Sequence, residues 1–272
     1  MYMYTYIRFP DFKDKALTLS YDDGVGQDAR LIEIMQKYGM KGTFNLNAGM
    51  MTGGRRLDRR DAFALYADSG MEVAMHGYDH LRLSASQKAI VMNEFYRDKT
   101  ELEELFGRIM RGGAYAYGDV TETALTVLRE LGVSYFRTTV STGRFDIPTD
   151  WLRLPATCHH NANLAELFER FTAPMPERPD RKDARLFYLW GHSYEFDDNS
   201  NWNVIDDFGR RVVERDDIWH ATNAEVFDYV AAYNRLVFSA AGDAVYNPSA
   251  LDVYLLTNGK NVLVKAGETA RL

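Results

Sequence analysis

Short apolar runs alternate with amphipathic stretches along most of the chain. Apolar runs bounded by turn residues predict strands at 16–20, 42–47, 71–75, 113–117, 133–139, 151–155, 185–190 and 218–222. Apolar residues at helical spacing predict helices at 28–38, 61–68, 86–106, 121–131, 164–171 and 222–236. Strands that alternate with helices are typical of parallel βα units, closed into a barrel or wound open.

The end of the chain follows a different pattern. Apolar and polar residues alternate over 252–256 and 261–265 on both sides of Asn258-Gly259, which is a hairpin turn signal. We therefore expect one α/β domain over residues 1–240 and a small antiparallel β appendage over 241–272, packed on the same domain.

Composition narrows the class of protein. The chain has 272 residues, 46% of them hydrophobic, which is enough for a sizeable core. A net charge of −7 disfavours nucleic acid as a partner. No apolar run is long enough for a membrane span, and the first residues do not resemble a signal peptide. The single cysteine, Cys158, excludes an internal disulfide. We expect a cytoplasmic protein that contacts no membrane, of open oligomeric state.

Two segments that follow predicted strands carry metal-ligand chemistry. Asp22 and Asp23 are adjacent, and side chains of successive extended residues point in opposite directions, so one carboxylate can face a metal while the other stays free as a base. His76 and His80 share one face if their segment forms a helical turn. One carboxylate and two imidazoles leave an open metal position, as hydrolysis requires. Taken singly, each segment also fits a surface turn or loop.

A third segment follows the predicted strand at 185–190. His192 stands at its end and can donate a proton to a leaving group, and Glu195 can orient the imidazole. A core histidine bonded to a carbonyl is the alternative. Trp190 suits either a platform that stacks on a sugar or the core.

The run Cys158-His159-His160 also contains ligand residues. Neighbouring side chains on a strand diverge, so we expect that they do not share one metal ion. We interpret the run as the rim of a substrate cleft, with His160 facing the substrate. An ordinary exposed loop fits equally well.

The combination of motifs resembles the polysaccharide deacetylase family, which contains the chitooligosaccharide deacetylase homology domain and is carbohydrate esterase family four. The family's Thr-Phe-Asp-Asp-Gly motif is matched by residues 20–24, its His-Ser/Thr-x-x-His motif by 76–80, and its Leu-x-x-His motif by 189–192. Its Arg-x-Pro-Tyr-Gly motif is matched only in part, by residues 114–118. The ordered resemblance covers about residues 14–240.

The resemblance implies a distorted (β/α) barrel with fewer than eight repeats. It implies that Asp23, His76 and His80 hold a divalent metal, with zinc favoured and cobalt, nickel or manganese as alternatives. It further implies that Asp22 is the base, that His192 is the acid, and that the backbone N–H of Tyr117 stabilises the oxyanion.

The chain departs from the family at several positions. Ala114 stands where the family has the arginine that bonds the base, so Arg111, Arg137 or Arg153 must substitute, or the base is held less firmly; we assign Arg111 to the substrate cleft. Gly77 stands where the family has a hydroxyl residue. Trp151 loosely matches the family's tryptophan motif, as either a packing or a substrate residue.

Three functions remain open at this point. The first is a metal-dependent hydrolase that removes acetyl groups from N- or O-acetylated saccharides. The second is a hydrolase of small cyclic amides or ureides on the same fold. The third is a decayed catalyst that binds saccharide on Trp190, Trp151 and Tyr117, against which the intact Asp22 and His192 argue.

Overall fold

The computed structural model describes residues 4–272, and its centre is a nine-stranded sheet in which every pairing is parallel. The order is β7-β6-β5-β4-β3-β2-β9-β8, and β10 also pairs with β2. The strands are β2 (Lys15–Asp22), β3 (Gly42–Leu46), β4 (Glu72–Met75), β5 (Gly112–Ala114), β6 (Tyr135–Ser141), β7 (Leu154–Ala156), β8 (Cys158–His159), β9 (Arg185–Gly191) and β10 (Ile218–His220).

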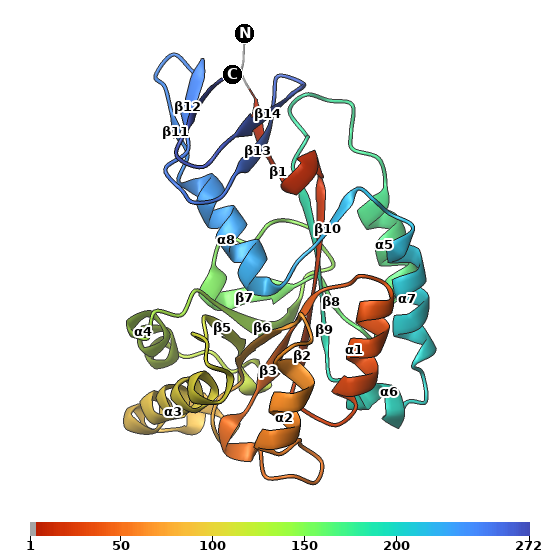
Figure 1. The fold of residues 1–272 in the computed structure, drawn as a ribbon, viewed down its shortest axis with the longest axis vertical. Helices are drawn as coiled ribbons and strands as arrows, with labels where there is room; N and C mark the ends of the chain where they lie inside the picture. The colour runs from red at the N-terminus through yellow and green to blue at the C-terminus, as the bar shows by residue number, and fades with distance from the viewer. Residues whose placement is uncertain (1–3) are drawn as a thin grey trace.

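Helices surround this sheet, as Figure 1 shows. They are α1 (Asp28–Lys37), α2 (Arg59–Tyr66), α3 (Lys88–Phe106), α4 (Glu122–Glu130), α5 (Leu164–Thr172), α6 (Tyr194–Asp198), α7 (Asn203–Val213) and α8 (Asn223–Asn234). Short 3₁₀ turns include η4 (Ala116–Gly118) and η5 (Trp151–Arg153). Thr222 and Glu225 form a capping box at the start of α8. None of the helices in the described part of the chain has the length and apolar character that crossing a membrane requires.

The two ends of the sheet, β7 and β8, are consecutive along the chain and are separated only by Thr157. The backbone N–H of Thr157 donates to the carbonyl of Tyr188 on β9, 2.9 Å away. The sheet therefore curls until its edges meet, which gives the distorted α/β barrel that the family resemblance implied.

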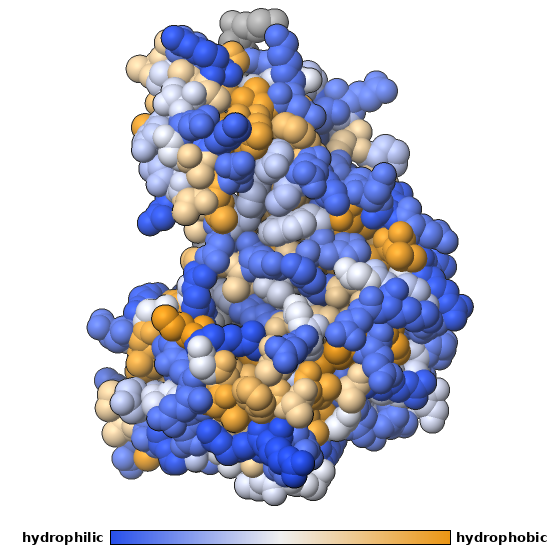
Figure 2. Space-filling model, viewed as in Figure 1, coloured by the Kyte–Doolittle hydropathy of each residue, from blue (hydrophilic) through white to orange (hydrophobic). Residues whose placement is uncertain are grey.

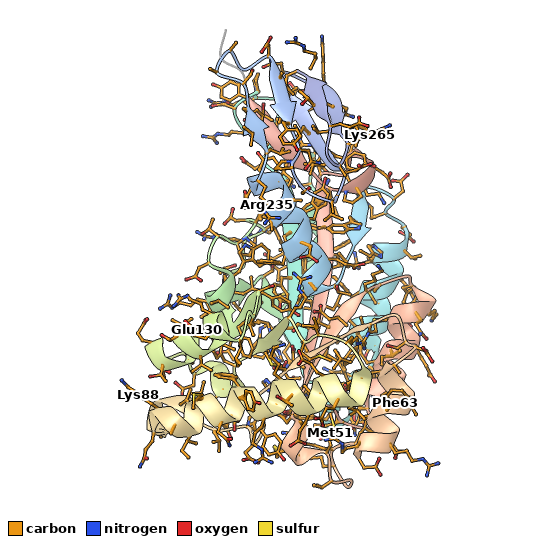
Figure 3. All side chains as sticks on the ribbon, turned by 60° about the vertical axis from the view of Figure 1, so that its left-hand side comes forward. Met51, Phe63, Lys88, Glu130, Arg235 and Lys265 are labelled. Carbon is orange, nitrogen blue, oxygen red and sulfur yellow. The ribbon has the colours of Figure 1, made fainter. Side chains whose placement is uncertain are left out.

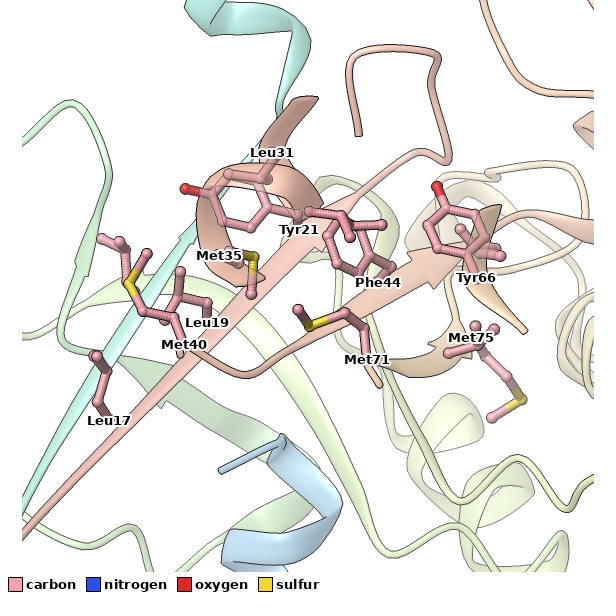
Figure 4. Packing of buried hydrophobic residues seen from close by; sticks show 14 of the residues in the cluster. Leu17, Leu19, Tyr21, Leu31, Met35, Met40, Phe44, Tyr66, Met71 and Met75 are labelled. Carbon is pink, nitrogen blue, oxygen red and sulfur yellow. The ribbon is translucent and has the colours of Figure 1, made fainter. Parts of the chain in front are cut away.

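The central strand β2 is buried at every position, so both of its faces are covered. Leu17, Leu19 and Tyr21 pack in the main hydrophobic cluster with Met35 of α1 and Phe44 of β3 (Figure 4). The alternate positions of β2 carry polar groups, among them Thr18, Ser20 and Asp22. This alternation points the end of β2 into a polar barrel interior.

The antiparallel part of the chain forms two small sheets. One has the order β1-β13-β14, from β1 (Thr5–Arg8), β13 (Val253–Thr257) and β14 (Lys260–Val264); the other has the order β11-β12-β15, from β11 (Val237–Phe238), β12 (Ala244–Tyr246) and β15 (Thr269–Arg271). Thr257 pairs with Lys260 across the expected Asn258-Gly259 turn. The pairing of β1 with β13 joins the two ends of the chain, which the sequence pattern did not indicate.

These small sheets lie far from the loops that follow the parallel strands. Figure 3 places Lys265 at one end of the molecule and Met51, in the loop after β3, at the other end, where α3 crosses. In Figure 2, hydrophilic residues cover most of the visible face, and apolar residues lie among them in small groups.

Two helices, α6 and α7, were not predicted. Ile205, Phe208 and Val212 form a buried face on α7, at spacing that the surrounding charged residues concealed. The strand predicted at 113–117 ends at Ala114, and the chain turns through η4 instead.

Candidate active site

Asp22 is the last residue of β2, and only 2% of its surface is exposed. Its carboxylate accepts hydrogen bonds from Asn45 Nδ2, at 2.8 Å, and from Arg137 Nη2. Burial alone would raise the pKa of Asp22, but the charge of Arg137, followed by those of His76 and His192, lowers this pKa well below its usual range. Asp22 is therefore a buried carboxylate that stays ionised.

Arg137 itself is fixed by several contacts from β6. Its Nε lies 3.2 Å from Ser20 Oγ, and its Nη1 donates to the carbonyl of Thr138 at 3.0 Å. The guanidinium also stacks on Trp190, 4.4 Å from the ring centroid. These contacts hold one cation against Asp22 in the barrel interior.

Asp23 turns out of the strand with φ 88°, and its Oδ1 and Asp22 Oδ2 approach the same nitrogen, His76 Nε2, at 3.7 and 3.8 Å. Asp23 Oδ1 lies 3.7 Å from Nε2 of His76 and 3.7 Å from Nε2 of His80. His76 Nδ1 donates to the carbonyl of Ala114, 2.8 Å away, so Nε2 is the nitrogen that faces the carboxylate. Burial, with the neighbouring His76, lowers the pKa of His80 to about 4, so His80 is neutral at physiological pH.

This donor set fits a divalent cation. One ligand atom from each of Asp23, His76 and His80 lies within 4.8 Å of the others. Asp23 Oδ1 is buried, and no hydrogen-bond donor among residues 4–272 satisfies it. Arg56 Nη1 approaches this oxygen to 2.9 Å, but it donates instead to the Asp23 carbonyl and to Asn47 Oδ1, each at 2.6 Å. A carboxylate and two imidazoles are a donor set suited to zinc.

Two buried acids hold the histidine loop. The Asp98 carboxylate accepts from the backbone N–H groups of His76, at 3.0 Å, and Gly77, at 2.8 Å, and burial raises the pKa of Asp98 to about 8. Glu94 accepts from the N–H groups of Asp79 and Leu81, each at 3.1 Å. These carboxyl groups take the supporting role of the hydroxyl that the family has at position 77.

Gly77 is required by this arrangement. Its φ is 82°, and a Cβ at this position would lie 2.7 Å from Glu94 Oε1. The departure from the family at residue 77 therefore accompanies a different means of holding the loop.

His192 follows β9 and approaches Asp22 from the other side. His192 Nε2 lies 4.0 Å from Asp22 Oδ2, and His192 Nδ1 lies 3.2 Å from Glu195 Oε1. Burial would lower the pKa of His192, but the hydrogen bond to Glu195 and the charge of Asp22 outweigh burial and raise it. The arrangement favours a protonated imidazole beside an ionised carboxylate.

Tyr117 lies in the tight η4 turn after β5, with φ 58°. Its ring is 56% exposed and packs edge-on against His80, with ring centroids 4.6 Å apart. The N–H groups of Gly118 and Asp119 make the hydrogen bonds of this turn, and the Tyr117 N–H takes no part in them.

Two residues predicted to contact substrate are buried instead. Trp190 is 8% exposed and packs under Arg137 and against His159, so it belongs to the core. His160 has no exposed surface and stacks between Tyr21 and Phe196, with ring centroids 5.8 Å and 4.2 Å away. The interpretation of both as substrate-binding residues was wrong, because Trp190 is covered by Arg137 and His159, and His160 is enclosed between β2 and α6.

Arg111 and Trp151 lie outside the site. Arg111 precedes β5, at the opposite end of the sheet, and forms a bidentate ion pair with Asp228 of α8 at 2.6 and 2.7 Å. Trp151 packs edge-on against Phe227, with ring centroids 5.2 Å apart. Neither contacts the cluster around Asp22, so the substrate-binding role expected for them is corrected.

Sequence reasoning missed several residues of the site. Asn45 lies beside Asp22 in the register of β2 and β3, and Arg56 and Asp98 reach the site from a loop and from α3. Asn45 has a sequence signal, since it lies at the end of a predicted strand next to β2. Arg56 and Asp98 have no such sequence signal, because the chain contains many other charged residues.

One family model matches part of this chain. The family model described as polysaccharide deacetylase matches residues 10–136. No curated protein matches the chain.

Solved structures match over most of the chain. A family four carbohydrate esterase from Streptomyces lividans, in complex with acetate, is 14% identical, covers 77% of this chain and 93% of its own, and gives a TM-score of 0.53. A Mycobacterium smegmatis protein assigned to the polysaccharide deacetylases is 17% identical over 84% and 94%, with a TM-score of 0.59. A family four pseudoenzyme from Bacillus anthracis is 13% identical over 82% and 68%, with a TM-score of 0.53. At these identities the likeness shows the fold, and the pseudoenzyme illustrates that the fold alone does not imply catalysis.

Proposed function

Because this chain belongs, over residues 10–136, to the polysaccharide deacetylase family, we propose that it is a metal-dependent hydrolase that removes acetyl groups from N- or O-acetylated saccharides. The observation that carries the proposal is the position of Asp22. Its ionised carboxylate lies between Arg137, the cluster of Asp23, His76 and His80, and the imidazole of His192.

Each of these groups has a part in hydrolysis. A divalent cation, zinc in our proposal, held by Asp23, His76 and His80 would polarise the acetyl carbonyl and make water more acidic. Asp22 accepts the proton of the attacking water, as an ionised carboxylate can.

The remaining steps use Tyr117, which follows β5, and His192, which follows β9. The N–H of Tyr117 donates to the oxyanion that develops on the acetyl carbonyl. His192 gives its proton to the departing nitrogen or oxygen as the bond to the acetyl carbon breaks, so the products are acetate and the free amine or alcohol.

A pocket beside the cluster gives substrate a place to bind. It holds about 500 Å³ and is lined by Asp23, Met50, Arg55, Arg56 and Tyr194, among others. This volume is in the range of small-molecule sites.

The test is acetate release from a panel of N- and O-acetylated saccharides, with small cyclic amides as the comparison set. We expect release from the acetylated saccharides that stops with a chelator and returns with zinc. Hydrolysis of the cyclic amides alone would reassign the substrate. Saccharide affinity that needs no metal, without acetate release, would identify a binding protein.

A further inference from the structure

A second group of metal-ligand side chains lies behind His192. His159 and His160, at the end of β8, and Glu195, at the start of α6, bring one ligand atom each within 4.8 Å of the others. Glu195 Oε2 lies 3.1 Å from His159 Nε2 and 2.9 Å from His160 Nε2. The two imidazoles lie closer than neighbouring strand residues are expected to lie, with ring centroids 4.4 Å apart, and Cys158 is not part of the group.

Although Glu195 Oε2 and His160 Nε2 are close, the two atoms do not have the geometry of a hydrogen bond. Glu195 Oε2 and both ring nitrogens of His160 are buried and have no hydrogen-bond partner in the part of the chain that the structure describes. His160 has no exposed surface at all. A buried polar group without a partner costs about 1–3 kcal/mol, so the facing pair of Glu195 Oε2 and His160 Nε2 requires an explanation.

The donor types of the group suit a cation. His159 and His160 each offer an imidazole nitrogen and Glu195 offers a carboxylate oxygen, which are the kinds of ligand that divalent metals bind in proteins.

We propose that His159 Nε2, His160 Nε2 and Glu195 Oε2 form a second divalent-cation site, of the zinc class, separate from the site at Asp23, His76 and His80. Two imidazoles and one carboxylate are a common zinc donor set. The buried position of His160 depends on Gly191, because a Cβ at residue 191 would lie 2.1 Å from His160 Nδ1.

The second site connects with His192 through one carboxylate. Glu195 uses Oε2 for the site and Oε1 for His192 Nδ1, 3.2 Å away. A cation there sets the orientation of Glu195 and thereby that of His192. Binding of this second cation does not depend on the proposed reaction. The metal content of the protein therefore tests the second site independently of turnover.

A hydrogen-bonded relay is the competing explanation. His159 Nδ1 accepts from the N–H of Asn161 at 3.2 Å, so in the absence of a cation His159 carries its proton on Nε2, toward Glu195. Binding of a cation at Nε2 moves this proton to Nδ1. The hydrogen bond from the Asn161 N–H to Nδ1 is then lost. The two explanations differ in the number of metal ions bound.

The experiment counts zinc per chain by elemental analysis after dialysis, with Co²⁺ absorption spectra as a second readout. We expect two equivalents in the unchanged protein and one each in Asp23→Ala, His159→Ala and His160→Ala. His220→Ala is the matched control and should keep two, since His220 lies at the opposite end of β2 and bonds the carbonyl of Gly39.

One equivalent in the unchanged protein and none in Asp23→Ala would overturn the proposal, as would two in His159→Ala. Should the buried His160→Ala variant fail to fold, His159→Ala decides the question, because the His159 side chain is 22% exposed. Glu195→Gln preserves size and removes the charge, and we expect it to lose the same single equivalent.

Discussion

Arg137 lies directly beside Ala114 in the parallel register of β5 and β6, and its guanidinium reaches Asp22 across the barrel interior. The family has its arginine at the position of Ala114. In this chain the neighbouring strand supplies the cation, and Ala114, which is fully buried, leaves room next to it. Asp22, the base in our proposal, is thus held by an arginine that enters from a different strand.

Asp22→Asn should abolish turnover and leave metal binding intact. The amide keeps the size of the carboxylate but cannot take a proton from water, and general base catalysis contributes about 10²–10⁴-fold. The check is kcat together with metal content. Normal turnover in this variant would remove Asp22 as the base, and loss of metal as well would make it a ligand.

Arg137→Ala should destabilise the fold and shift the pH profile. The change leaves Asp22 ionised and unpaired in the interior, and breaking a buried pair costs about 3–5 kcal/mol. Arg137 lowers the pKa of Asp22, so its removal raises this pKa, and the acidic limb of kcat/KM moves to higher pH.

Arg137→Lys is the matched variant, since it keeps the charge but loses the fork that joins Ser20 and Asp22. We expect it to recover the pH profile in part. An unshifted acidic limb in Arg137→Ala would show that Arg137 does not control the base.

The sequence predicted which polar residues follow the strands and gather at one site. It did not identify the residues that support them. Asp22, His76 and His192 could be placed together because the carboxyl ends of parallel strands meet at one edge. Arg111, Arg137 and Arg153 were equal candidates because the choice depends on the register between strands and on the face to which each points.

The sequence also did not show that His159 and His160 lie close together, because this too depends on the local backbone direction. The alternation rule assumes extended backbone, but β8 contains only Cys158 and His159, and the chain turns at His160. Both rings then reach Glu195, which belongs to a helix that the sequence pattern did not reveal.

Gly77→Ser should weaken the protein, although serine is a residue that the family has at this position. Residue 77 has a left-handed φ, where a side chain costs about 1–3 kcal/mol, and its Cβ would press on Glu94. Thermal unfolding and zinc affinity should both fall. Gly39→Ser is the control, since it shares a positive φ and has open space around it; equal losses in the two variants would remove the role of Glu94.

Arg111→Ala should leave kcat/KM unchanged. Arg111 pairs with Asp228 at the far end of the sheet, and both side chains are more than a third exposed. A surface pair contributes about 0–1 kcal/mol to stability, so only a small fall in the melting temperature is expected. A raised KM would return Arg111 to the substrate cleft.

Asp28 should make the protein less stable as the pH rises from about 4 to about 7. Asp28 is fully buried and accepts from Ser193 Oγ at 2.5 Å, Tyr66 Oη at 2.6 Å and the Val25 N–H at 3.2 Å. Burial outweighs these hydrogen bonds and raises its pKa from 3.8 to about 7. Between these pH values the folded protein keeps a proton on Asp28 that the unfolded chain loses. The contribution of Asp28 to the free energy of unfolding is therefore largest below pH 4.

The measurement is the free energy of unfolding of the unchanged protein and of Asp28→Asn across this pH range. The difference between them should fall with rising pH, by at most about 4 kcal/mol, and level off above pH 7. Asp206→Asn supplies the opposite sign, because the hydrogen bond from Lys37 lowers the pKa of Asp206, and its contribution is lost as the pH falls. A pH-independent difference for Asp28→Asn would mean that Asp28 is ionised in the folded state, held by Ser193, Tyr66 and the Val25 N–H against the cost of burial.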